Sequence, residues 1–281
     1  MAIAAILLLF SASTFILFRV HRKKAAGSRR HIAGLLRIVN VNVAVMAFLI
    51  YASVYYHADG TALAAMKSDE VVSVKKTDTG WMFDGPSQED VLIFYPGAKV
   101  EETAYAPLLR LIAQEEMDVF LVKMPLRLAF FGMNKAEEIL EDAQYSRYYI
   151  GGHSLGGAMA ATYAAEHERE LSGLILFAAY PTKETSLDTI LLYGSGDEVL
   201  NREKVSRADD LVSGRYEEIV IDGGNHAWFG NYGAQRGDGE ADITAQEQQS
   251  RTVEEIRAFV SEAEDTGAAV STTERVGKDY E

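Results

Sequence analysis

The chain has 281 residues, of which 48% are hydrophobic, and this is enough for one large domain plus an appendage. It contains no cysteine, which excludes disulfides and thiolate metal sites. Residues 1–57 hold seven lysines and arginines and no acid, whereas the other 224 residues hold 20 basic and 41 acidic side chains. A surface this acidic repels nucleic acid and anionic headgroups, so we expect no nucleic-acid partner.

Two apolar runs without charged residues lie near the N-terminus, at residues 2–18 and 38–56. Each is close to the roughly 20 residues that a helix needs to cross a bilayer. The segment between them is rich in lysine and arginine, and short basic loops stay in the cytoplasm. We therefore expect a multi-pass anchor in the cell membrane, with the rest of the chain extracytoplasmic and three tyrosines as outer-interface anchors: Tyr51, Tyr55 and Tyr56.

Both runs have alternative interpretations. The first could be a cleaved signal peptide, although its basic residues follow the apolar run instead of preceding it. The second contains Asn40 and Asn42 and could be a buried or interfacial helix, because asparagine in a membrane needs polar partners.

The whole chain divides into four predicted parts. Residues 1–57 form the two-helix anchor and residues 58–69 a juxtamembrane linker. Residues 70–262 form the globular domain. Residues 263–281 show no periodicity and are expected to be disordered.

The globular domain begins with a hairpin pattern, VVSVKKTD and WMFDG, within residues 70–85. Short apolar runs of strand length then alternate with segments of helical periodicity. Strands are expected at 91–97, 118–123, 148–151, 174–178, 189–193 and 218–221, and helices at 103–116, 134–144, 155–166 and 241–262. This alternation predicts an α/β fold with a mostly parallel sheet and helices on both faces.

A G-x-S-x-G pattern follows the strand at 148–151 and opens the next helix. A serine at such a sharp strand–turn–helix connection is exposed at the carboxyl edge of the sheet. Gly152 and Gly156 are expected where side chains would collide with neighbouring elements. The pattern therefore makes Ser154 a candidate nucleophile.

A serine nucleophile needs a base, and the region after residue 57 offers three histidines. His153 adjoins the serine and points away from its hydroxyl, and His167 lies several turns along the following helix. His226 remains, after a strand and a Gly-Gly loop. Its orienting acid should follow the strand between serine and histidine, which favours Asp197; Asp222 and Glu198 are the rivals.

The tetrahedral intermediate of acyl transfer needs two amide donors. Leu155 follows the nucleophile and supplies the first candidate amide. The second should come from the loop after the strand at 91–97, where Ala98 is preferred and Lys99 is the alternative.

Four segments together resemble the α/β-hydrolase superfamily, in its dienelactone-hydrolase-like branch known as alpha/beta hydrolase family 5: FYPGAKVE at 94–101, GGHSLGGAMAA at 151–161, YGSGDEVL at 193–200 and GGNHAWFGNYGAQRGDGEA at 223–241. The resemblance implies an α/β-hydrolase fold, the chain order serine, acid, histidine, and carboxylesterase-like activity. The cap of this fold is usually inserted between the strands at 174–178 and 189–193, where only about ten residues stand here. We therefore expect no cap domain.

The expected function is hydrolysis of carboxylic esters or related acyl bonds through an acyl-enzyme on Ser154, without metal or cofactor. The substrate would be a small-molecule or lipid-like ester. Six apolar residues could line an acyl pocket or belong to the core: Leu128, Phe130, Phe131, Met133, Trp228 and Phe229. Thioesterase, amidase or acyltransferase chemistry, and a non-catalytic membrane-anchored binding protein, remain alternatives.

Overall fold

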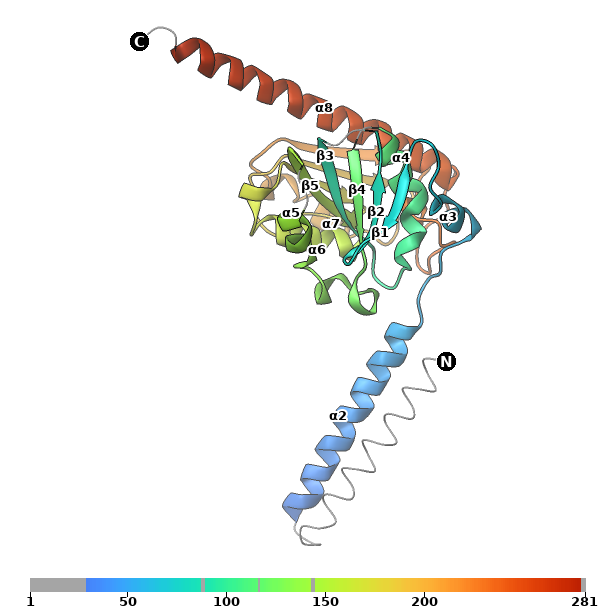
Figure 1. Ribbon diagram of the computed structural model, residues 1–281. Coiled ribbons are helices and arrows are strands. Elements are labelled where there is room, and N and C mark those ends of the chain that lie inside the picture. The colour runs from blue at the N-terminus through green and yellow to red at the C-terminus, as the bar shows by residue number, and fades with distance from the viewer. Residues whose placement is uncertain (1–28, 87–88, 116, 143–144, 279–281) are drawn as a thin grey trace. The chain divides into compact units, whose positions relative to one another are not determined.

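A computed structural model describes residues 29–86, 89–115, 117–142 and 145–278, without the side chains of 29–33, 35–36 and 263–278 (Figure 1). The chain divides into two compact units, Met1–Tyr55 and Tyr56–Glu281. The second unit contains an eight-stranded sheet, which confirms the predicted α/β fold.

The strands of this sheet lie in the order β1-β2-β4-β3-β5-β6-β7-β8. β1 and β2 form the predicted antiparallel hairpin, β2 also pairs antiparallel with β4, and all the other pairs are parallel. The bounds are β1 Ser73–Lys76, β2 Gly80–Asp84, β3 Asp90–Tyr95, β4 Met117–Val122, β5 Arg147–His153, β6 Gly173–Phe177, β7 Thr189–Gly194 and β8 Tyr216–Ile221.

The helices lie between and after these strands. Their bounds are α2 Arg29–Ser53, α3 Gly60–Ala65, α4 Ala106–Gln114, α5 Lys135–Asp142, α6 Leu155–Ala164, α7 Arg202–Val205 and α8 Ala245–Lys278. Short 3-10 turns include η1 Glu102–Tyr105, η2 Pro125–Arg127, η3 Ala129–Phe131 and η6 Ala227–Phe229.

The strand order determines which face each helix covers. The chain moves from β3 to β4 in one direction across the sheet, and from β4 through β5 to β6 in the other. Because parallel crossovers are right-handed, α4 must lie on one face and α5 and α6 on the other. α8 packs against α4, so both faces of the sheet are covered (Figure 1).

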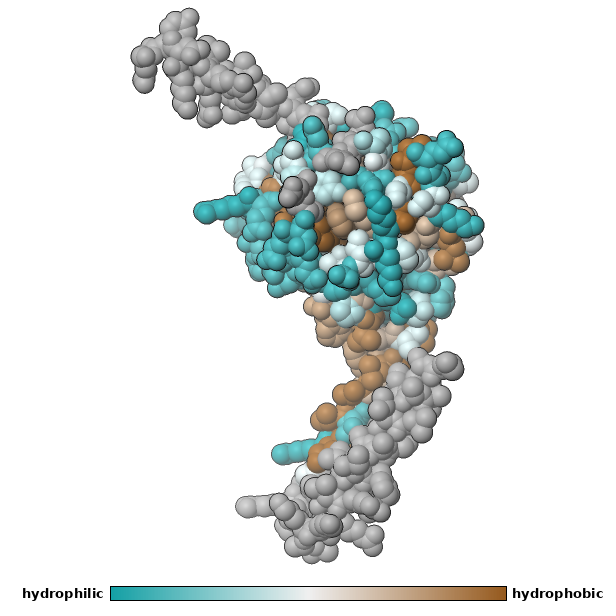
Figure 2. Space-filling view, in the orientation of Figure 1, coloured by the Kyte–Doolittle hydropathy of each residue, from teal (hydrophilic) through white to brown (hydrophobic). Residues whose placement is uncertain are grey.

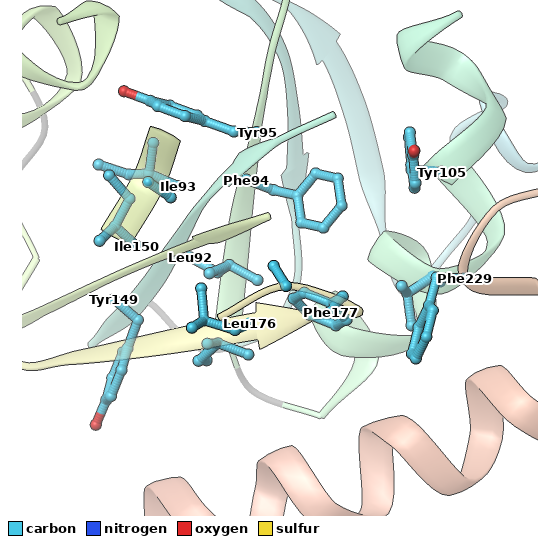
Figure 3. Packing of buried hydrophobic residues seen from close by; sticks show 14 of the residues in the cluster. Leu92, Ile93, Phe94, Tyr95, Tyr105, Tyr149, Ile150, Leu176, Phe177 and Phe229 are labelled. Carbon is cyan, nitrogen blue, oxygen red and sulfur yellow. The ribbon is translucent and has the colours of Figure 1, made fainter. Parts of the chain in front are cut away.

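The central strands consist of apolar residues because both of their faces are buried. Every residue of β3, β6 and β7 is buried. Figure 3 shows the aromatic side of this core, where the rings of Phe94, Tyr105, Phe177 and Phe229 gather. The Phe177 ring meets Phe94 and Phe229 edge-on, at centroid separations of 5.4 and 5.9 Å.

The direction of the chain reverses between β3 and β5, whose following segments leave toward opposite faces of the sheet. Such a topological switch point opens a crevice at the carboxyl ends of the strands, where ligands bind in α/β proteins. The predicted nucleophile and the predicted anion-binding loop follow these two strands.

The connection between β6 and β7, residues 178–188, contains no helix, and all of it lies within the described residues. The expected absence of a cap at this position therefore agrees with the described structure.

Residues 56–69 differ from their prediction, because they belong to the globular unit. Tyr56 bridges to Val100, and its backbone exchanges hydrogen bonds with Lys99 and Glu101 at 2.7 and 2.8 Å. These contacts place the backbone of Tyr56 in the globular unit, and its position at the outer membrane interface stays a prediction. The linker expected at 58–69 contains α3, whose N-terminus is capped by the Asp59 carboxylate and whose Ala62 is fully buried.

The last helix also differs from its prediction. α8 begins at Ala245 instead of residue 241 and continues to Lys278, into the segment expected to be disordered. The side chains after residue 262 lie outside those described.

The predicted membrane anchor is not confirmed. The apolar run at 2–18 lies outside the described residues. The run at 38–56 forms the larger part of α2, which ends at Ser53, and hydrophobic side chains are exposed along it (Figure 2). Among the described helices, none combines the length and the apolar character that crossing a membrane requires.

We predict that Phe177→Ala lowers the free energy of unfolding by about 3–5 kcal/mol, because it leaves a cavity in the aromatic core. Phe130→Ala is the matched control, since the Phe130 side chain is 48% exposed, and it should cost less than about 0.5 kcal/mol. Urea denaturation of the full chain measures both values. Similar losses in the two variants would contradict this description of the core.

Candidate active site

Ser154 lies at the turn between β5 and α6 with φ 53° and ψ −123°. This left-handed backbone is strained for a residue with a side chain, and such strain is held only when the surroundings enforce it. The Ser154 amide donates to the Phe177 carbonyl at 2.9 Å, which ties the turn to β6. The side chain is half-buried at the carboxyl edge of the sheet, as the G-x-S-x-G pattern predicts.

The two predicted glycines of this turn are required by close backbone approach. A Cβ atom at Gly152 would lie 2.4 Å from the Tyr95 carbonyl oxygen, and one at Gly156 would lie 2.2 Å from the same atom. Any side chain at either position would therefore push the turn away from β3.

Asp197 and His226 form a buried pair beside this turn. His226 Nδ1 lies 2.8 Å from Asp197 Oδ2, and both side chains are almost completely shielded from solvent. The other carboxylate oxygen, Oδ1, accepts the amides of Val199 and Leu200, each at 2.8 Å. The carboxylate is thus fixed by three donors, and it can hold the proton of His226 on Nδ1.

The structure pairs His226 with Asp197 and not with either rival acid. Asp222 is exposed and accepts a long 3.5 Å hydrogen bond from the Ser195 hydroxyl. Glu198 is exposed as well.

The second ring nitrogen of His226 is available. His226 Nε2 is buried and has no hydrogen-bond partner among the described residues. No hydrogen bond joins it to the Ser154 hydroxyl in the described structure. The two residues nevertheless lie at one sheet edge, because the ring of His153, next to Ser154, is 4.5 Å from the His226 ring. Such contacts are often loose in a site without substrate and close in the complex.

Asp238 stabilises the loop that carries His226, a role that was not predicted from the sequence. Its carboxylate accepts the amides of His226, Ala227 and Gly239 at 3.2, 2.8 and 2.9 Å. The segment 223–241 could have indicated this role, because it contains more polar residues than a catalytic triad requires.

Helix α8 supports the same loop through a second pair. The side chain of Gln248 accepts the Asn225 amide and donates to the Asn225 carbonyl, each at 2.9 Å. The Asn225 side chain in turn donates to the Gly239 carbonyl and accepts the Trp228 amide. The loop that carries His226 is therefore held by side chains and not by a regular element.

Two backbone amides are candidates for binding an oxyanion. The amide of Lys99 donates to the Arg127 carbonyl at 2.9 Å, so it is occupied. The amides of Ala98 and Leu155 have no hydrogen-bond acceptor in the part of the chain that the structure describes. This favours Ala98 over Lys99 as the second donor.

The apolar residues proposed for an acyl pocket separate into two groups. Leu128 and Phe229 are buried core residues, whereas Phe130 and Phe131 are exposed. Met133 and Trp228 are partly buried against the core. Among the described residues, no group of histidines and acids suitable for a metal ion is found.

Comparison with known proteins agrees with this architecture. Residues 91–250 match the family described as Alpha/beta hydrolase family. No curated protein matches the chain. Among solved structures, a predicted CIB-like hydrolase of Thermoplasma acidophilum is similar, with a TM-score of 0.52 and 15% identity over 66% of this chain and 99% of that chain.

Two further structures are similar at the level of the fold. A dienelactone hydrolase of Anabaena variabilis has a TM-score of 0.50 and 11% identity, over 67% of this chain and 96% of its own. A bacterial heroin esterase has a TM-score of 0.50 and 14% identity, over 70% of this chain and 87% of its own.

We predict that Asp238→Ala lowers the free energy of unfolding by about 1–3 kcal/mol, because it removes the acceptor of three loop amides. Asp242→Ala is the control: Asp242 follows in the same segment, but its exposed carboxylate makes no hydrogen bond among the described residues. Urea denaturation compares the two variants. Equal stability would show that the carboxylate does not support the loop.

Proposed function

Because this chain belongs to the alpha/beta hydrolase family, we propose that it is a serine hydrolase that cleaves carboxylic esters or related acyl bonds through an acyl-enzyme on Ser154. The observation that carries the proposal is the His226 ring. One nitrogen is bonded to a buried carboxylate, and the other is buried without a partner beside the strained serine turn.

Each proposed step uses a group described above. His226 Nε2 takes the proton of the Ser154 hydroxyl while the serine oxygen attacks the substrate carbonyl. The Asp197 carboxylate stabilises the resulting imidazolium, and the amides of Leu155 and Ala98 receive the oxyanion. The leaving group takes the proton from His226 and departs. Water then gives a proton to His226 while its oxygen attacks the acyl carbonyl. The bond from the carbonyl carbon to the Ser154 oxygen breaks, the acid leaves, and His226 returns the proton to the serine oxygen.

The proposed substrate class is supported by the residues exposed near the candidate site. The connection between β6 and β7, which the structure describes completely, contains no helix. Leu126, Phe130 and Phe131 are exposed on the segment that contacts the Ala98–Lys99 loop. This arrangement favours a small or lipid-like ester that approaches an open site. Thioester, amide or acyl-transfer chemistry would use the same groups.

We predict that a fluorophosphonate probe labels the protein covalently and that Ser154→Ala abolishes the labelling. Hydrolysis of p-nitrophenyl esters should fall on the order of 10⁴-fold or more in the same variant. Ser195→Ala is the control, because Ser195 is an exposed serine that follows β7 at the same sheet edge. Labelling that survives Ser154→Ala, or its absence from a folded wild-type chain, would refute the proposal.

We also propose that the N-terminal segment attaches the hydrolase domain to the extracytoplasmic side of the cell membrane. The proposal is supported by the apolar runs at 2–18 and 38–56, the basic residues between them, and the exposed valines of α2.

The membrane proposal predicts that the full chain sediments with membranes, resists extraction by salt, and is released by detergent. Protease added to intact cells should digest the domain. Recovery in the high-speed supernatant would contradict membrane attachment, and protection of the domain from protease would contradict its orientation.

A further inference from the structure

Three buried hydrogen bonds run in series behind the candidate site. The Gly97 amide lies 3.0 Å from the Tyr105 hydroxyl, which lies 2.8 Å from His153 Nδ1. His153 Nε2 lies 3.0 Å from the carbonyl oxygen of His226. The series therefore connects the loop after β3 with the residue proposed as base.

The groups at the two ends of the series, the Gly97 amide and the His226 carbonyl, determine where the hydrogens of Tyr105 and His153 lie. An amide N–H only donates and a carbonyl oxygen only accepts. His153 must therefore carry its hydrogen on Nε2, and the Tyr105 oxygen must accept from Gly97. The Tyr105 hydroxyl then donates to Nδ1, which is unprotonated in this neutral tautomer. A protonated His153 would instead donate from Nδ1 to the Tyr105 oxygen, and the hydrogen of the Tyr105 hydroxyl would then lose its acceptor in this series. The neutral form is therefore the one in which every donor of the series has an acceptor.

Burial maintains that arrangement. The pKa of His153 is held well below its usual value, first by burial and then by the neighbouring His226. Burial also raises the pKa of Tyr105 above its usual value, so its hydroxyl keeps its proton. The series consequently keeps one direction of donation, from the Gly97 amide to the His226 carbonyl.

Both ends of the series and His153 adjoin or belong to the proposed site. Gly97 precedes Ala98, and His153 precedes Ser154. A Cβ atom at Gly97 would lie 2.7 Å from the Tyr105 oxygen and 2.8 Å from His153 Nδ1, so the loop rests directly on this pair. The Phe94 and Tyr232 rings pack against Tyr105, at centroid separations of 5.0 and 6.3 Å, and limit its movement.

We infer that Tyr105 and His153 are positioning residues of the proposed serine hydrolase, which fix the Gly97–Ala98 peptide and the backbone of His226 relative to Ser154. The inference rests on the proposed function. A merely structural pair would satisfy buried polar atoms and contribute to stability. A positioning pair also sets the turnover rate, because small displacements of reacting groups are costly.

The proton arrangement can be tested without any activity. In ¹⁵N-labelled full-length protein, the His153 ring should show the neutral Nε2–H tautomer from about pH 5 to about pH 8, a range in which an ordinary histidine titrates. His153→Gln identifies the resonance by its loss. A hydrogen on Nδ1, or titration within this range, would overturn the inference.

The positioning role is tested by kinetics on variants. Tyr105→Phe removes one hydroxyl and should lower kcat on a p-nitrophenyl ester about 10- to 100-fold with little change in KM. Tyr163→Phe is the matched control: Tyr163 is equally buried, on α6, but its hydroxyl has no partner among the described residues. It should keep the wild-type kcat.

Two substitutions of His153 distinguish an effect on the positions of the reacting groups from an effect on the stability of the protein. Glutamine can place an N–H near the position of Nε2 and still donate to the His226 carbonyl, whereas asparagine is too short. His153→Gln should therefore retain more kcat than His153→Asn at comparable melting temperature. Equal kcat in Tyr105→Phe and Tyr163→Phe, or equal loss in both His153 variants, would overturn the inference. If the fluorophosphonate probe did not label Ser154, the proposed function would be refuted instead. The ¹⁵N spectrum of the His153 ring would still test the proton arrangement in that case.

Discussion

The candidate site depends on one desolvated contact, the hydrogen bond between His226 Nδ1 and Asp197 Oδ2. A buried carboxylate is costly unless donors surround it, and Asp197 receives two amides besides the imidazole. Arg202 stabilises the loop that carries Asp197. Its guanidinium donates to the carbonyls of Gly194 and Asp197 and lies 4.1 Å from the Tyr193 ring centroid. The pair is thus held in place before any substrate arrives.

Local patterns were sufficient to predict the sheet and the groups that follow its strands. Buried parallel strands are continuous apolar runs, and the chain alternates between them and helices, so both the fold and the edge that carries Ser154 could be expected. The pairing of Asp197 with His226 could be expected too, because the loops after neighbouring parallel strands meet at one edge. β7 and β8, which precede these two residues, are such neighbours.

The supporting polar network could not be predicted in the same way. Asp238 and Gln248 act through backbone amides and carbonyls, and no periodicity in the sequence marks which backbone groups lack a partner in a loop. His153 was excluded as the base because its side chain points away from the Ser154 hydroxyl. The same orientation places its ring between Tyr105 and the His226 carbonyl. Tyr56 was assigned to an apolar run because its neighbours are apolar, although its hydrogen bonds belong to the domain.

The backbone of Ser154 has a consequence for how the protein can evolve or be engineered. A serine held at φ 53° costs on the order of 1–3 kcal/mol, which neighbouring packing must offset. Glycine would adopt this conformation without strain, so replacing the serine with glycine would relieve that cost and remove the hydroxyl. Selection for thermal stability alone would favour glycine at this turn, whereas the proposed hydrolysis requires the serine hydroxyl.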